Sequence, residues 1–403
     1  MLLSLTILLL AGRTTSVVDS RDQVPPAGVS LQLPATYVMT SPVSRVLDTL
    51  TLLSNPQSAA LLIAVAAIVV AWLFVTRARS KRRTWVRVLI GFGVVLVAII
   101  VLEAMVILLP RPMARLVVED PNAVVVDFHS HTLHSKDANQ RFTAEDRRAW
   151  HRDGGFNIGY ISDHVRFGGA LEAAERNPAR AGDGVSELSA AEGRYHRIMS
   201  TILLGLTAAD ANGLDSKGHL LPGIPASGRR PVAIVALPNR NLDSLTAETL
   251  DSVEHFSGIE LVDAAPRGLG QLDREEAKVR ELAARLRLVL VSASNNHGYG
   301  RAVASWNLMT IPGWRDLSPD SVGRLIEQRF HDRDLDAVTI VKRLRPRAHG
   351  FAVVSTLPVA SWQMLGSLAW AERVVWIAWI WAAWLVVVLI RTRRSTDANS
   401  ISA

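Results

Sequence analysis

Three stretches of the chain are apolar over a length that could cross a bilayer. They cover residues 59–75, 88–109 and 374–390, and the only charged residue among them is Glu103, near the end of the second. A membrane-spanning helix needs about 20 predominantly apolar residues. We therefore predict three transmembrane helices rather than buried core helices, the more so because each run borders a basic cluster or is rich in tryptophan. Glu103 is expected to reach the membrane interface.

Between the second and third apolar runs, short segments rich in β-branched residues alternate with amphipathic stretches. The strand-like segments are residues 122–128, 156–162, 201–206, 231–237, 258–264 and 287–294. Helical patterns lie between several of them, one of them after Thr143, which is a suitable N-cap. This alternation favours an α/β fold, either a barrel or a doubly wound sheet.

Local charge gives the chain an orientation. The segments 76–87 and 391–394 carry six and three Lys or Arg residues, which together exceed the formal net charge of +7. Basic residues beside hydrophobic spans mark cytoplasmic loops, whereas a nucleic-acid surface would spread its charge over a folded domain. We therefore expect a lipid bilayer as partner and no nucleic acid. The segment between the spans is then periplasmic or extracellular.

These patterns divide the chain into a membrane part and one soluble domain. The expected parts are a signal peptide or anchor (1–12), an external linker rich in Pro, Ser and Thr (13–58), a basic cytoplasmic loop (76–87), a metal-binding barrel (110–360), a juxtamembrane segment (361–373) and a cytoplasmic tail (391–403), with the three spans between them.

Polar clusters follow three of the predicted strands. They are Asp127-Phe-His129-Ser-His131, Asp163-His164 and Asn295-Asn296-His297. Because side chains at the carboxyl ends of barrel strands gather at one face, we expect all three clusters to meet. The chain contains no cysteine, so a metal here would be held by His, Asp and Glu, which suits Zn, Mn or Fe.

The His-x-His pair can bind one cation, and Glu192 is the best candidate for a carboxylate that bridges to a second. Bridged metals lower the pKa of a water molecule and polarise a phosphoryl or carbonyl oxygen. Glu187 is the alternative to Glu192. His134 is expected to point away from the pair because of strand alternation. Two arginines that follow the clusters, Arg166 and Arg301, could grip a phosphate in bidentate fashion.

The motif Asp-Phe-His-Ser-His-Thr, with the later ISDH, a lone Glu and Ser-Asn-Asn-His-Gly, resembles the polymerase and histidinol phosphatase (PHP) superfamily over about residues 121 to 300. The resemblance implies a distorted (βα)7 TIM-like barrel and a site of one to three divalent metal ions that hydrolyses phosphoesters. It implies ligand roles for His129, His131, Asp137, His164, Glu192, Asn295 and His297. The catalytic residues would be His129, His131, Glu192 and His297.

The sequence departs from the family pattern at two positions. Leu237 precedes Pro238 where the family commonly has histidine, and Asn295 stands where aspartate is usual. His196 and His219 are loose candidates for a further ligand. We therefore predict a membrane-anchored metal-dependent hydrolase, most simply a phosphoesterase acting on a small-molecule phosphoester. The alternatives are a non-catalytic sensory or scaffold domain and hydrolysis of an amide or carboxylic ester.

Overall fold

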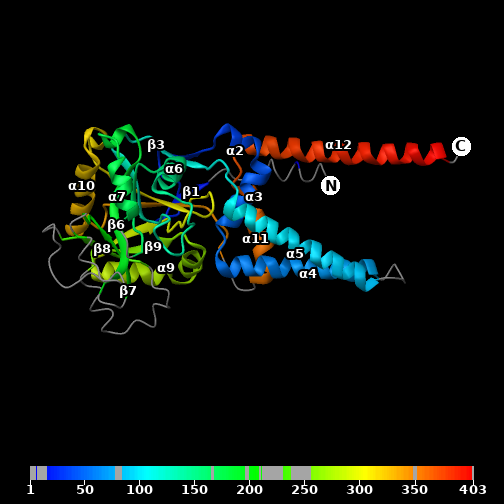
Figure 1. The fold of residues 1–403 in the computed structure, drawn as a ribbon, viewed down its shortest axis with the longest axis horizontal. Coiled ribbons are helices and arrows are strands. Elements are labelled where there is room, and N and C mark those ends of the chain that lie inside the picture. The colour runs from blue at the N-terminus through cyan, green and yellow to red at the C-terminus, as the bar shows by residue number, and fades with distance from the viewer. Residues whose placement is uncertain are drawn as a thin grey trace.

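A curled sheet and a set of long helices occupy opposite ends of the molecule (Figure 1). The computed structural model describes residues 6, 16–77, 84–164, 168–195, 199–207, 210, 230–236, 256–347 and 352–401. The sheet has ten strands in the order β1 (Val17–Asp19), β12 (Thr339–Arg343), β11 (Ser305–Thr310), β4 (Ala123–Ser130), β5 (Ile158–Ile161), β6 (Ser186–Tyr195), β7 (Met199–Leu204), β8 (Val232–Val235), β9 (Gly258–Asp263) and β10 (Val289–Ala293).

The sheet curls until β10 approaches β4. An isolated parallel bridge joins Ser130, at the end of β4, to Asn296, just beyond β10. The side-chain amide of Asn307 on β11 connects the same two strands, because it donates to the carbonyl oxygens of Val126 and Ser292 at 2.9 and 2.7 Å. The carboxyl ends of β4 and β10 are thereby held side by side.

The expected (βα)7 alternation is not confirmed. Strands β4, β5 and β6 pair in parallel, as do β8, β9 and β10, but β7 runs antiparallel to both of its neighbours, β6 and β8. Strand β6 ends at Tyr195 and β7 begins at Met199, which leaves no room for a helix between them. Over the described residues the structure is a mixed α/β half-barrel, with β7 antiparallel between two sets of parallel strands.

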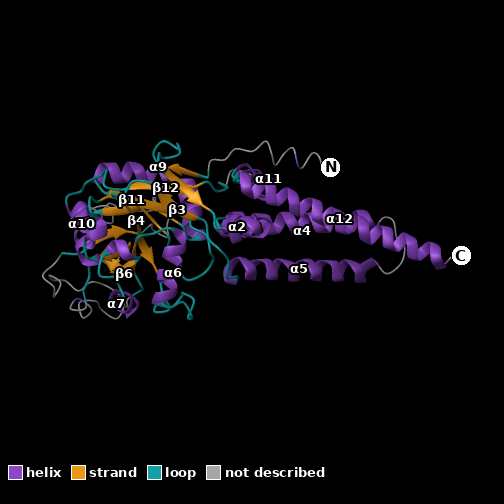
Figure 2. Ribbon diagram, turned by 90° about the horizontal axis from the view of Figure 1, so that it is seen from above, coloured by secondary structure: helices purple, strands orange, loops and turns teal. Residues whose placement is uncertain are grey.

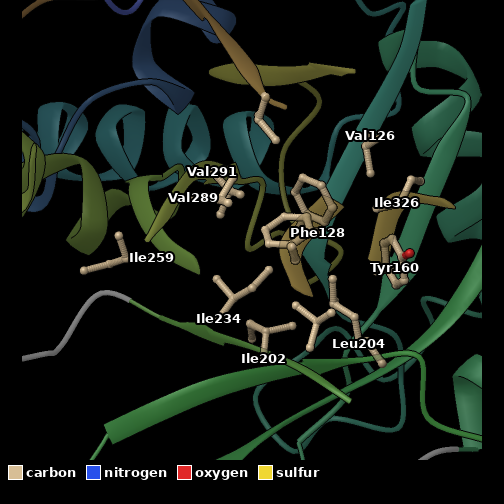
Figure 3. Packing of buried hydrophobic residues seen from close by; sticks show 14 of the residues in the cluster. Val126, Phe128, Tyr160, Ile202, Leu204, Ile234, Ile259, Val289, Val291 and Ile326 are labelled. Carbon is tan, nitrogen blue, oxygen red and sulfur yellow. The ribbon is translucent and has the colours of Figure 1, made fainter. Parts of the chain in front are cut away.

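The interior of the curled sheet is filled by aliphatic and aromatic side chains (Figure 3). Phe128 of β4 stacks on Tyr160 with ring centroids 5.8 Å apart and meets the edge of Phe330 at 5.3 Å. The helices α6 (Ala144–Gly154), α7 (Gly168–Glu175), α9 (Pro266–Leu286) and α10 (Pro319–His331) belong to the same domain. Thr143 caps α6 in a reciprocal capping box with Asp146, as its position in the sequence predicts.

The segment 13–58, expected to be an external linker, is instead part of the folded domain over its described residues. Strand β1 pairs with β12, β2 (Val29–Gln32) pairs with β3 (Arg115–Val118), and α2 (Ala35–Met39) and α3 (Ser41–Thr51) follow. Asp48 of α3 is buried and accepts from Tyr37, Arg111 and Arg343 at 2.8 to 2.9 Å. Two of its partners, Arg111 and Arg343, are distant in sequence, so the local composition concealed this packing.

Three helices extend away from the sheet (Figures 1 and 2). They are α4 (Asn55–Arg77), α5 (Thr84–Leu108) and α12 (Trp370–Ile401), while the shorter α11 (Ala352–Gly366) packs beside α4. The stretches Asn55–Trp72, Leu89–Leu108 and Trp370–Thr392 are long and apolar enough to cross a membrane. The expected boundary at residue 360 between barrel and juxtamembrane segment falls inside α11 rather than between elements.

Candidate metal centre

The centre is built at the end of β4, where the chain leaves the sheet. The pairing of β4 with β5 is irregular between Asp127 and Ser130, and such irregularities re-aim side chains. The Nε2 atoms of His129 and His131 face each other at 2.9 Å. An oxygen of Glu192, on β6, lies 3.2 Å from the first and 3.4 Å from the second. Both histidines are buried, and the glutamate side chain is 12% exposed.

Neighbouring acceptors fix the tautomers of both histidines. Nδ1 of His129 lies 2.7 Å from a carboxylate oxygen of the buried Glu260. Nδ1 of His131 lies 3.0 Å from the hydroxyl of Ser135, and that hydroxyl uses its own proton to bond Asp163 at 2.9 Å. Each Nδ1 must therefore donate, so Nε2 of a neutral His131 is an acceptor, whereas Nε2 of His129 is an acceptor only when that ring is neutral.

Two imidazole lone pairs in contact repel each other unless a cation lies with them. The cation can be a proton or a metal ion. Burial lowers the pKa of His129, but the carboxylates of Glu260 and Glu192 outweigh it and raise that pKa well above its ordinary value. That raised pKa places a proton on Nε2 of His129 when no metal is bound, and a divalent ion would replace this proton. The geometry fits such an ion, because the donor atoms of His129, His131 and Glu192 all lie within 4.8 Å of one another.

A second group of donors adjoins the first. Nε2 of His164 and Nε2 of His297 each lie 3.4 Å from the same oxygen of Asp137. Nδ1 of His297 donates to the carbonyl of Asn295 at 3.0 Å, and its buried Nε2 has no hydrogen-bond partner among the described residues. Glu192 also lies 3.1 Å from Nδ1 of His164, so this carboxylate stands between the two groups.

The charge states suit metal binding. Burial alone would raise the pKa of Glu192, but the positive charge and hydrogen bond of His129, with further help from His164, lower it to about 2. Burial and the neighbouring histidines, His297 first, hold the pKa of His131 well below its usual range. At neutral pH the glutamate is anionic and His131 is neutral, which are the forms that ligate metals, whereas His129, with its raised pKa, must release a proton as a metal binds.

Asn295 borders the first group with its backbone in the left-handed region, at φ 40°. Its amide nitrogen donates to Asp263 at 3.1 Å, while its amide oxygen is buried without a hydrogen-bond partner among the described residues. Burial, together with the charge of Glu260, raises the pKa of Asp263 to about 7. The oxygen of Asn295 is therefore available as a neutral ligand.

Two acidic residues of β9, Glu260 and Asp263, were not anticipated. A carboxylate in the middle of the apolar segment Gly258–Asp263 was the available signal, since buried acids are rarely present without a partner. A further buried network lies behind the site. His151 of α6 is 3.1 Å from Asp127 and 2.8 Å from Glu187.

Several expected residues lie elsewhere. Glu187, the alternative to Glu192, is wrong as a bridging ligand because it is fully buried against His151. The guanidinium of Arg301, expected to grip a phosphate, donates in this structure to Asp153 at 2.6 Å and to the carbonyl of Arg111. His134 lies 3.8 Å from Glu172, away from both donor groups. Arg166, His196, His219 and Leu237 fall outside the described residues.

No protein-family model matches the chain, and no curated protein matches it. Among solved structures, the chain is similar to PsfC from Pseudomonas syringae, with a TM-score of 0.38 and 15% identity over 60% of this chain and 98% of that one. A structure described as a metal-dependent phosphoesterase from Bifidobacterium adolescentis has a TM-score of 0.32 and 18% identity to this chain. The match covers 51% of this chain and 96% of that one. The lesion-specific endonuclease EndoQ from Pyrococcus furiosus has a TM-score of 0.39 and 17% identity to this chain. The match covers 54% of this chain and 57% of that one.

Proposed function

We propose that this chain is a membrane-anchored, metal-dependent phosphoesterase related to the PHP superfamily, with its half-barrel on the non-cytoplasmic side. The observation that carries the proposal is the convergence of the buried Nε2 atoms of His129 and His131 with a carboxylate oxygen of Glu192, all within 4.8 Å of one another.

Each donor group has a defined part in this proposal. His129, His131 and Glu192 would hold one divalent ion, and His164, His297 and Asp137 would hold another, with the oxygen of Asn295 beside the first. Bound ions of this kind lower the pKa of water and polarise a phosphoryl oxygen. Glu260 and Ser135 orient the histidines, and Glu192 would supply negative charge next to both donor groups.

The test compares metal content and hydrolysis in the full chain purified in detergent. Wild type should hold at least one tightly bound ion and cleave members of a panel of phosphomonoesters and phosphodiesters when supplied with Mn or Zn. The double variant His129→Ala/His131→Ala should lose both properties. His134→Ala is the matched control, because it removes a histidine of the same segment that lies outside the donor groups. Equal turnover by wild type and the double variant would refute the proposal.

A second candidate is a non-catalytic metal- or ligand-binding domain. It is favoured by Asn295, whose amide donates to Asp263 and brings no negative charge to the first donor group. Wild type that retains tight metal but cleaves no ester on the panel would favour this candidate. Metal content and turnover measured on one preparation therefore separate the two.

A further inference from the structure

A cavity of about 460 Å³ is lined both by residues at the border of the candidate metal centre and by residues of the long apolar helices. Its lining includes polar residues of the centre and apolar residues from the end of α3 and the last turn of α5. The residues that matter here are Asp137, Asn295 and His297 among the polar ones, and Leu50, Val106 and Ile107 among the apolar ones.

Two apolar residues that line this cavity belong to a candidate membrane span. Val106 and Ile107 belong to the stretch Leu89–Leu108. Ile107 is 41% exposed, and its neighbour Leu108 is 64% exposed. The cavity therefore lies at the level where the surface of a bilayer around α5 would meet the half-barrel.

Close packing fixes this position. The backbone N–H of Gly300, three residues beyond His297, donates to the carbonyl of Ile107 at 3.0 Å. Gly300 has φ +76°, and a Cβ atom on it would lie 2.9 Å from the Thr51 side chain. The loop that carries His297 is thus seated directly against the ends of α3 and α5.

We propose that the substrate is a lipid phosphoester, with its phosphate at the metal centre and a hydrocarbon chain along Leu50, Val106 and Ile107. This inference rests on the proposed phosphoesterase function and names its substrate class. A water-soluble ester has no hydrocarbon chain to bury against an apolar surface next to the bilayer. Burial of the methylene groups of a lipid there stabilises its bound state. Glu103 also lines the cavity, where its carboxylate can accept from a hydroxyl or ammonium group of the lipid.

The reaction is hydrolysis. The oxygen of a water molecule forms a bond to phosphorus, the phosphorus–oxygen bond to the lipid alcohol breaks, and that alcohol leaves with a proton. No oxidant, reductant or further co-reactant is needed.

The first test uses the full chain in nanodiscs with Mn and two matched pairs of esters. The pairs are dioleoyl phosphatidic acid with glycerol 3-phosphate, and dioleoyl phosphatidylglycerol with glycerophosphoglycerol. In the pair that is hydrolysed, kcat/KM for the lipid should exceed that for the soluble ester by about tenfold or more, which burial of roughly two methylene groups supplies. Equal values within the pair would overturn the inference.

A side-chain exchange then locates the chain-binding surface. Ile107→Trp should fill part of the cavity and lower kcat/KM for the lipid about tenfold relative to kcat/KM for the soluble ester, because a lost contact of two methylene groups has that effect. Leu108→Trp is the control, since Leu108 is exposed on the same turn and does not line the cavity. Equal effects of the two substitutions on lipid turnover would contradict the assignment.

A cross-linking experiment decides the lipid site without catalysis. Photoactivatable phosphatidic acid is added to the His129→Ala/His131→Ala variant, and adducts are mapped by mass spectrometry. Adducts concentrated in residues 50–53 and 103–107 support a lipid site in this cavity. If wild type then hydrolyses no ester, the phosphoesterase proposal is refuted and the lipid is a ligand rather than a substrate. Adducts spread evenly over α5 and α12 would overturn the inference.

Discussion

At the scale of single residues, the histidines of the candidate centre are usable ligands because other side chains set their protonation. Glu260 accepts a hydrogen bond from Nδ1 of His129, and Ser135, whose hydroxyl donates to Asp163, accepts one from Nδ1 of His131. Both Nε2 atoms therefore face the same space. Ligand-orienting partners of this kind are often as important as the ligands themselves.

We predict that Glu260→Gln lowers metal affinity about 10- to 100-fold, the range found when such orienting partners are replaced. The amide can still accept from Nδ1 of His129, but it removes the negative charge beside the ring. Affinity is measured by competition with a chelator. Glu276→Gln is the control, since Glu276 pairs with Arg280 and Lys342 outside the site. Unchanged affinity in Glu260→Gln would show that the carboxylate does not tune the ligand.

The four histidines of the centre could be predicted from sequence, whereas their partners could not. His129, His131, His164 and His297 each follow a recognisable strand, and strand ends on one face converge. Glu260 lies within a strand, and only the curl of the sheet brings it to His129, which is 131 residues away. The pairing of Arg301 with Asp153 could not be predicted for a related reason, because tertiary packing brings together two residues that are far apart in sequence.

At the scale of elements, helix α6 is joined to the strands behind the site by His151. Burial lowers the pKa of His151, but Glu187 and Asp127 together outweigh it, so the pKa is raised above its ordinary value of 6.5. A histidine whose folded pKa is raised stabilises the fold fully below the unfolded pKa and loses that contribution as pH rises through the folded value.

His151→Gln should therefore lower the melting temperature most at pH below about 6.5 and progressively less as the pH rises above it. Melting temperatures of wild type and variant are compared between pH 5 and pH 9, with a chelator present to exclude metal effects. A difference that is constant over this range would mean that the charge of His151 does not contribute.

A second element, α3, is held by the buried carboxylate of Asp48, which pairs with Arg111 and Arg343. Replacing one member of a buried ion pair leaves an uncompensated charge and costs about 3 to 5 kcal/mol. We expect Asp48→Asn to destabilise the full chain by this order, measured by denaturant unfolding in detergent. Asp336→Asn is the matched control, because Asp336 is exposed and its pairing with Arg21 contributes little. Equal effects would contradict this role of Asp48.

Element prediction from the sequence succeeded where apolar periodicity was strong. The segments that became β4, β5, β8, β9 and β10, and the three long helices, all carry such a signal. Strand β6 lacked it, because its sequence, SELSAAEGRY, is rich in small and polar residues. Strand β1 and helix α3 could not be predicted from local sequence because their partners are far away. Strand β1 pairs with β12, and Asp48 of α3 pairs with Arg111, more than sixty residues further on.

At the scale of the whole molecule, the basic ends of the long helices lie away from the sheet (Figures 1 and 2). Arg77 ends α4, and Arg391 lies in the last part of α12. Under the positive-inside rule, this arrangement favours the proposed topology, with the half-barrel outside the cytoplasm.

Labelling of single cysteines tests that topology, and the chain itself contains no cysteine to interfere. Asp336→Cys, at a position 90% exposed on the half-barrel, should react with a membrane-impermeant maleimide in cells whose outer surface is accessible. Ser80→Cys, in the basic loop, should react only after the membrane is permeabilised. The reverse pattern would place the half-barrel in the cytoplasm.

The pairing of β1 with β12 also constrains how the molecule is made. Val17 pairs with Arg343, a separation of 326 positions (343 − 17), so the edge of the sheet cannot close until nearly the whole chain has been synthesised. If α4 and α5 cross a bilayer, residues 16–53 and 109–347 must be delivered to the same side of it in two separate episodes of translocation. The early segment then waits with an unpaired strand until the later one arrives. Long-range pairing of this kind folds slowly, and biogenesis, rather than chemistry, sets the time at which the site is assembled.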